Sequence, residues 1–75
     1  MTISEIRQIV LDAVAVKEKS DDNAFASILQ DRIESFLFKV EQTMGMTIDD
    51  FPDGEEKVPL NIEEMAVELR ECYSL

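Results

Sequence analysis

Carboxylates are the commonest chemically active groups of this chain, and they are unevenly spread along it. Between positions 49 and 71, nine acidic residues stand against Lys57 and Arg70, which places −7 of the net charge of −10 in this stretch. One acidic segment, residues 49–56, holds Asp49, Asp50, Asp53, Glu55 and Glu56. Calcium prefers such oxygen ligands, but an EF-hand loop needs acidic or Asn residues at alternate positions before its Gly. Phe51 occupies the middle position, so we predict a solvated acidic loop and no metal site.

The side chains that most enzymes use for catalysis are scarce. The chain has no histidine, which excludes a Ser-His-Asp triad, a Cys-His pair and a His-containing zinc site. Its one cysteine, Cys72, can form neither an intrachain disulfide nor a zinc thiolate cluster, and this fits a reducing compartment. The first residues lack the basic region of a signal peptide, and acidic residues interrupt every apolar run. We therefore expect a soluble, cytoplasmic protein that is not an enzyme.

The spacing of apolar residues predicts helices. With 75 residues, 45% of them apolar, the chain has material for one modest core, so residues 1–75 are expected to form a single acidic helical domain. Two Gly and two Pro are too few for the frequent turns of a small β-fold. The predicted fold class is all-α, a small bundle of three to four helices.

The first helix is predicted by apolar residues three and four positions apart. Thr2 and Glu5 have the spacing of a capping box at its start. Residues 20–23 prefer turns and caps to helix interiors, so the first loop is expected there. The apolar stripe is Ile6, Ile9, Val10, Ala13 and Val14.

The second helix is the longest periodic segment. It is expected to reach Met44, with Gly45 ending it. It begins either at Ala24 or, after a short turn, near Asp31. Its apolar positions are Phe25, Ile28, Leu29, Ile33, Phe36, Leu37, Val40 and Met44. Phe38 falls off this stripe and is either a contact residue for a partner or, as is commoner, a side chain covered by a loop.

The last helix follows a turn at residues 52–54, where Pro-Asp-Gly supplies a fixed φ and a permissive glycine. Residues 58–60 are expected to anchor this loop to the core. Asn61 and Glu64 have capping-box spacing, so we expect the helix to begin at Asn61. Its apolar positions are Ile62, Met65, Ala66, Leu69, Cys72 and Tyr73, and Cys72 is expected to be a buried thiol.

The uneven charge favours a protein partner with a basic surface, and disfavours nucleic acid and anionic membranes. Glu64, Glu68 and Glu71 share one face of the last helix, although any solvated helix of an acidic protein has such a face. The expected docking residues are Glu34, Phe38, Glu41, Asp49, Asp50, Asp53, Glu55 and Glu56. The protein is expected to be a monomer or a weak homodimer.

Residues 36–48 carry a family resemblance. Their sequence, FLFKVEQTMGMTI, resembles the second half of helix 2 and the following linker of acyl carrier proteins. Residues 3–17 and 61–69 look like the first and last helices of that family. The resemblance implies a helical bundle with a long loop before helix 2, and docking of helix 2 on basic partner surfaces. It also implies a serine that carries 4′-phosphopantetheine, whose thiol holds an acyl group.

The family's Asp-Ser-Leu motif is absent from the expected position. An ungapped alignment places Gln30 at the serine, and residues 31–33 are Asp-Arg-Ile. Ser27 is the preferred alternative attachment residue because Ile28 and Leu29 follow it, and Ser35 is the other candidate. The alternative is that neither serine is modified and that the chain has a carrier-like fold without the arm. A different class of function is an acidic inhibitor, antitoxin-like or immunity-like protein that masks a basic site by charge mimicry. A third is a homodimer that buries Phe38.

Overall fold

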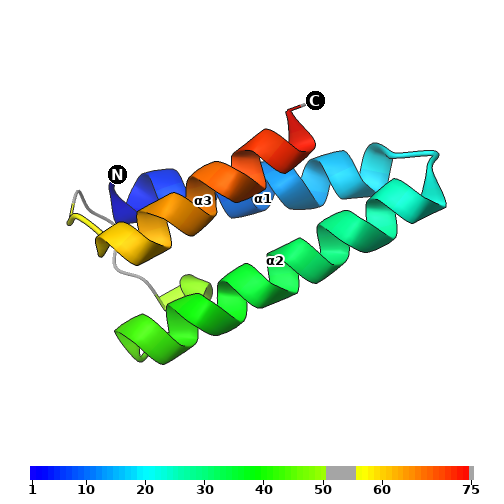
Figure 1. Ribbon diagram of the computed structural model, residues 1–75. Coiled ribbons are helices and arrows are strands. Elements are labelled where there is room, and N and C mark those ends of the chain that lie inside the picture. Colours follow the sequence, from blue (N-terminus) through cyan, green and yellow to red (C-terminus); the bar gives the residue numbers. More distant parts are fainter. Residues whose placement is uncertain (51–55, 75) are drawn as a thin grey trace.

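The computed structural model describes residues 1–50 and 56–74, and this part of the chain forms three helices (Figure 1). They are α1 (Ile3–Lys19), α2 (Asn23–Met44) and α3 (Leu60–Tyr73), with a short 3-10 turn, η1 (Ile48–Asp50), after α2. The described residues contain no strand, although Thr2 and Lys57 form an isolated antiparallel bridge. The predicted all-α small bundle is therefore confirmed. No helix within these residues has the length and apolar character needed to cross a membrane.

Each of the three helices packs against the other two. Figure 1 shows α1 and α3 side by side, with α2 running back along them and α3 stopping short of the corner between α1 and α2. The backbone of residues 56–58 follows the start of α1, where the Ile3 amide donates to the Glu56 carbonyl (3.0 Å) and the Val58 amide to the Met1 carbonyl (3.1 Å). The connection from α2 to α3 therefore approaches α3 past the beginning of α1.

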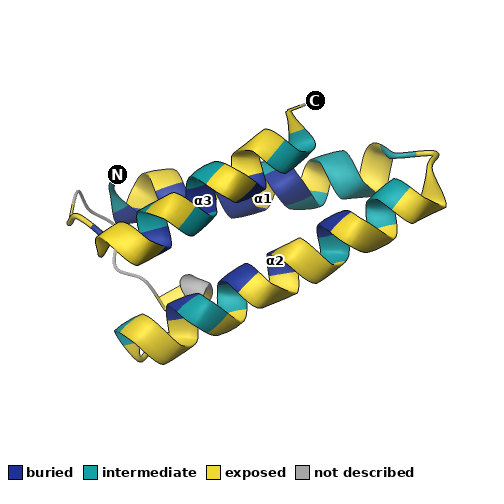
Figure 2. Ribbon diagram, in the orientation of Figure 1, coloured by how far each residue is buried: buried dark blue, intermediate teal, exposed yellow. Residues whose placement is uncertain are grey.

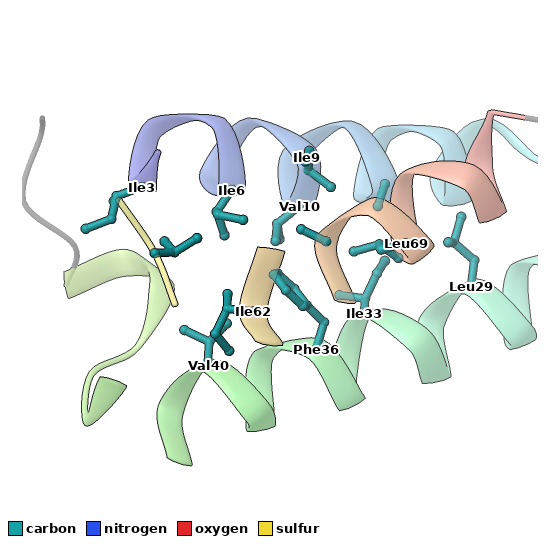
Figure 3. Close-up of a cluster of buried hydrophobic side chains, with 13 residues drawn as sticks. Ile3, Ile6, Ile9, Val10, Leu29, Ile33, Phe36, Val40, Ile62 and Leu69 are labelled. Carbon is teal, nitrogen blue, oxygen red and sulfur yellow. The ribbon is translucent and has the colours of Figure 1, made fainter. Parts of the chain in front are cut away.

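The core is a cluster of apolar side chains between the helices (Figure 3). Its buried members are Ile3, Ile6, Ile9, Val10, Ala13, Leu29, Ile33, Phe36, Val40, Val58, Ile62, Ala66 and Leu69. Most lie at the predicted stripe positions, which confirms the helical periodicity of all three segments. Among the predicted stripe residues of the second helix, Ile28 is an exception, because its side chain is 53% exposed. Leu29, the next residue, points into the core, and neighbouring residues on a helix are about 100° apart.

The beginnings of α1 and α2 are fixed by side-chain caps. The Thr2 hydroxyl accepts from the Glu5 amide, and the Glu5 carboxylate accepts from the Thr2 amide, so the predicted capping box is confirmed. At α2, the Asp22 carboxylate accepts from the amides of Ala24 (3.0 Å) and Phe25 (3.2 Å). Because this cap starts the helix at Asn23, the alternative beginning near Asp31 is wrong.

The end of α2 is confirmed and the beginning of α3 is not. Gly45 ends α2 with φ at 72°, a backbone conformation that residues with a Cβ atom rarely adopt. At α3, Pro59 precedes the first helical residue and no side chain caps the helix, so the predicted capping pair of Asn61 and Glu64 is wrong. The Pro59 carbonyl already accepts from the amides of Ile62 and Glu63, which draws the helix start back to Leu60 and places Asn61 inside the first turn. Val58 anchors this segment in the core, whereas Leu60 is 69% exposed and does not.

Candidate docking surface

Phe38 is the most exposed aromatic side chain among the described residues, with 61% of its surface accessible. It follows Phe36 by two positions, which turns the two rings about 200° apart on a helix. Because Phe36 is fully buried, Phe38 points away from the core. The predicted covering loop is absent from the described residues: η1 packs on α2 and residues 56–58 follow α1 instead. Figure 2 shows the side of α2 turned away from α1 and α3 as mostly exposed.

Two carboxylates flank Phe38 on the same side of α2. Glu34 precedes it by four residues and Glu41 follows it by three, so both are its neighbours on the helix surface. Both side chains are exposed, and neither takes part in an ion pair within the described part of the chain. Glu34, Phe38 and Glu41 are referred to below as the outer face of α2. This face offers an apolar ring between two negative charges.

The acidic segment is described only in part. Asp49 and Asp50 are exposed in η1, where the Thr47 hydroxyl donates to the Asp50 carboxylate (2.8 Å), and Glu56 is exposed beyond it. Asp53 and Glu55, like Phe51, lie outside the described residues. Since η1 contacts α2, the carboxylates of Asp49 and Asp50 lie at the same end of the molecule as Glu41, in the last turn of α2. The described residues contain no group of three side chains arranged to hold a metal ion.

The candidate attachment serines lie within α2. Ser27 is the fifth residue of the helix and is exposed, and Ser35 is exposed in its middle. The connection before α2 has only three residues, 20–22, where the resemblance implies a long loop. Gln30, at the aligned position, is half-buried, accepts from the Lys17 ammonium of α1 and donates to the Glu34 carboxylate (3.0 Å). Ser27 therefore fits a phosphopantetheine arm in its accessibility alone, and its surroundings do not match those that the resemblance implies.

A groove between α2 and α3 was not predicted from the sequence. It has a volume of about 400 Å³. Its lining residues are Ile28, Asp31, Arg32, Ser35 and Phe36 from α2 and Met65, Glu68 and Leu69 from α3. Phe36 and Leu69 are buried and form its floor, while Ile28 stands exposed at its edge. The only sequence signal for it is the adjacent pair Ile28 and Leu29, since both side chains cannot face the same core.

A smaller hollow, of about 220 Å³, lies between α1 and α3 beside Tyr73. Burial raises the pKa of the Tyr73 hydroxyl above its ordinary 10.0, the charge of Asp12 raises it further, and Arg70 opposes both. Cys72, the preceding residue, packs against the core but is only half-buried, so the expected full burial is not reached. Glu64, Glu68 and Glu71 are exposed, as their spacing on α3 predicts.

Comparison with known proteins finds no matching family model, no matching curated protein and no matching solved structure. The resemblance to acyl carrier proteins therefore rests on the residue pattern alone.

Proposed function

We propose that this protein is a binding module that docks on a basic surface of another protein through the outer face of α2. The observation that carries the proposal is the placement of Phe38, exposed between Glu34 and Glu41 on the longest helix. With 61% of its surface accessible, the Phe38 side chain contributes little to the stability of the monomer. At an interface it can fill an apolar pocket, and aromatic residues are frequent among the residues that dominate binding energy.

The charge distribution supports a partner protein with a basic surface. A net charge of −10 on 75 residues attracts basic surfaces over several ångströms and speeds their encounter with the protein. Glu34 and Glu41 would then pair with Lys or Arg side chains around the pocket that receives Phe38. Asp49 and Asp50 of η1 add further negative charge at the end of α2 where Glu41 lies. In its simplest form the docking is itself the function: the protein masks a basic site, as an inhibitor, antitoxin-like or immunity-like protein does.

The experiment that tests this proposal expresses three tagged versions of the protein in cells of the organism it comes from and compares the partner proteins that each version recovers. They are the wild type, Phe38→Ser, and Leu11→Ser as a matched control, because Leu11 is an apolar residue of α1 with a similar exposed fraction (56%). We expect a partner whose recovery falls with Phe38→Ser, stays unchanged with Leu11→Ser and decreases with added salt. Equal recovery by all three versions contradicts the proposal. A concentration-dependent dimer of the purified protein that Phe38→Ser abolishes would assign Phe38 to self-association instead.

A second candidate function is that of an acyl carrier, and the exposure of Ser27 near the start of α2 favours it. Docking would then bring a phosphopantetheine thiol on Ser27 to the partner enzyme. Co-expression with a phosphopantetheinyl transferase of broad specificity tests this by intact mass. A mass increase of one phosphopantetheinyl group that Ser27→Ala removes and Ser35→Ala retains supports the carrier function. An unchanged mass excludes it and leaves the docking proposal standing.

A further inference from the structure

The groove between α2 and α3 is a surface that the outer face of α2 does not include. Its floor is formed by Phe36 and Leu69, and its edge by the exposed side chain of Ile28. A branched apolar side chain left half in water beside an open apolar groove gains free energy when a second apolar surface covers it. The groove therefore resembles a contact between packed helices from which one helix is missing.

The charges around the groove select the occupant. Asp31 on α2 and Glu68 on α3 line it, and Glu64 and Glu71 continue the negative surface along the exposed side of α3. Arg32 is the one cation among its lining residues. An occupant with apolar side chains on one side and Lys or Arg on the other matches both the floor and these carboxylates.

The shape of the groove favours a helix. It lies between two helices, its walls of Asp31, Arg32, Ser35 and Glu68 are exposed, and α3 stops short of the α1–α2 corner (Figure 1). A pocket for a small molecule usually encloses most of its ligand. An open groove between two helices instead suits an amphipathic helix, which contacts it through residues three and four positions apart.

We propose that this groove binds a basic amphipathic helix of a partner protein, which inserts apolar side chains over Ile28, Met65 and Leu69 and places cationic side chains against Asp31 and Glu68. The groove shares no residue with the outer face of α2, although Ser35 lies three positions before Phe38 and the two sites therefore adjoin on the helix. The inference goes beyond the proposed function, because it names a second contact and the structure of the segment that makes it.

The test uses the isotope-labelled protein and three synthetic peptides. The first is an 18-residue amphipathic helix made of Leu and Lys, the second a scrambled peptide of the same composition, and the third a Leu and Glu version of the first. We expect the first peptide alone to bind, with amide shifts concentrated on the groove residues Ile28, Ser35, Met65 and Glu68. Shifts centred on Phe38, or equal binding of the scrambled peptide, would overturn the proposal.

Substitutions test the location of the peptide site independently of the amide shifts. Ile28→Ser is expected to weaken binding of the Leu/Lys peptide about tenfold, as truncation of an interface anchor does, while Leu11→Ser and Phe38→Ser leave it unchanged. The two binding surfaces are thereby tested separately. One further result would overturn the proposal: a homodimer of the protein without peptide that Ile28→Ser disrupts.

Discussion

Phe36 and Phe38 stand two residues apart on α2 and face opposite ways, one with 1% of its surface exposed and the other with 61%. The first is the largest fully buried side chain of the core, and the second lies on the outer face of α2 between Glu34 and Glu41. The same residue type therefore lies in two different environments on one helix. The core uses Phe36 for stability, and a partner is proposed to use Phe38 for binding.

The two phenylalanines are expected to respond oppositely to truncation. Phe36→Ala should lower the free energy of unfolding by about 3–5 kcal/mol, since it removes a buried ring and leaves a cavity. Phe38→Ser should change it by no more than about 0.5 kcal/mol, because the ring is already in water. Urea denaturation followed by circular dichroism measures both. Comparable losses for the two variants would mean that Phe38 is packed in solution.

The cap of α2 can be tested at Asp22. Its carboxylate accepts from the amides of Ala24 and Phe25, so Asp22→Ala should destabilise the protein by about 1 kcal/mol. Asp21→Ala is the matched control, since it removes the same charge from the preceding residue without a cap. If both variants lose the same stability, the effect is one of charge and the cap is unimportant.

The end of α2 can be tested at Gly45, whose φ is 72°. An added Cβ atom would meet no other atom within 4 Å, so the cost of a substitution comes from the backbone conformation alone. Gly45→Ala should therefore cost about 1–2 kcal/mol in thermal or urea unfolding. Gly45→Asn should cost less, because Asn tolerates this conformation better. An alanine variant as stable as the wild type would contradict the left-handed ending of α2.

Stability should fall at high pH because of Tyr73. Its pKa is raised above 10.0 in the folded protein, mainly by burial, so the neutral hydroxyl is the form that folding favours. This contribution is complete below pH 10.0 and is lost as the pH rises through the folded pKa. The chain has one tyrosine and no tryptophan, so the absorbance of tyrosinate reports this group directly. The titration midpoint should be higher in buffer than in urea, and Tyr73→Phe should lose less stability at high pH. Equal midpoints would contradict the burial of the hydroxyl.

The sequence was sufficient where local spacing decides the structure. The apolar stripes, the capping box of Thr2 and Glu5 and the ending at Gly45 each depend on residues within one or two turns, and all are confirmed apart from the stripe position of Ile28. The beginning of α3 was mispredicted because Pro59 and Asn61 both suit a helix start, and the choice depends on how Val58 anchors in a core built by distant residues.

The candidate site was less predictable than the fold for the same reason. Whether Phe38 is covered depends on the path of the chain after α2, and this path is held by hydrogen bonds to the start of α1. The groove at Ile28 depends on where α3 ends relative to α2, which no local pattern specifies. The charge pattern predicted exposed carboxylates at Glu34 and Glu41, but only the packing shows that an exposed aromatic ring lies between them.

The central claim is that Phe38 lies in a protein interface, and photo-crosslinking tests it most directly. A benzophenone amino acid is placed at position 38 in one version of the protein and at position 11 in another, and both are irradiated in cells. We predict that position 38 forms a discrete adduct with one protein, that position 11 does not, and that Glu34→Lys together with Glu41→Lys removes the adduct. The same adducts from both positions, or none from position 38, would contradict the account.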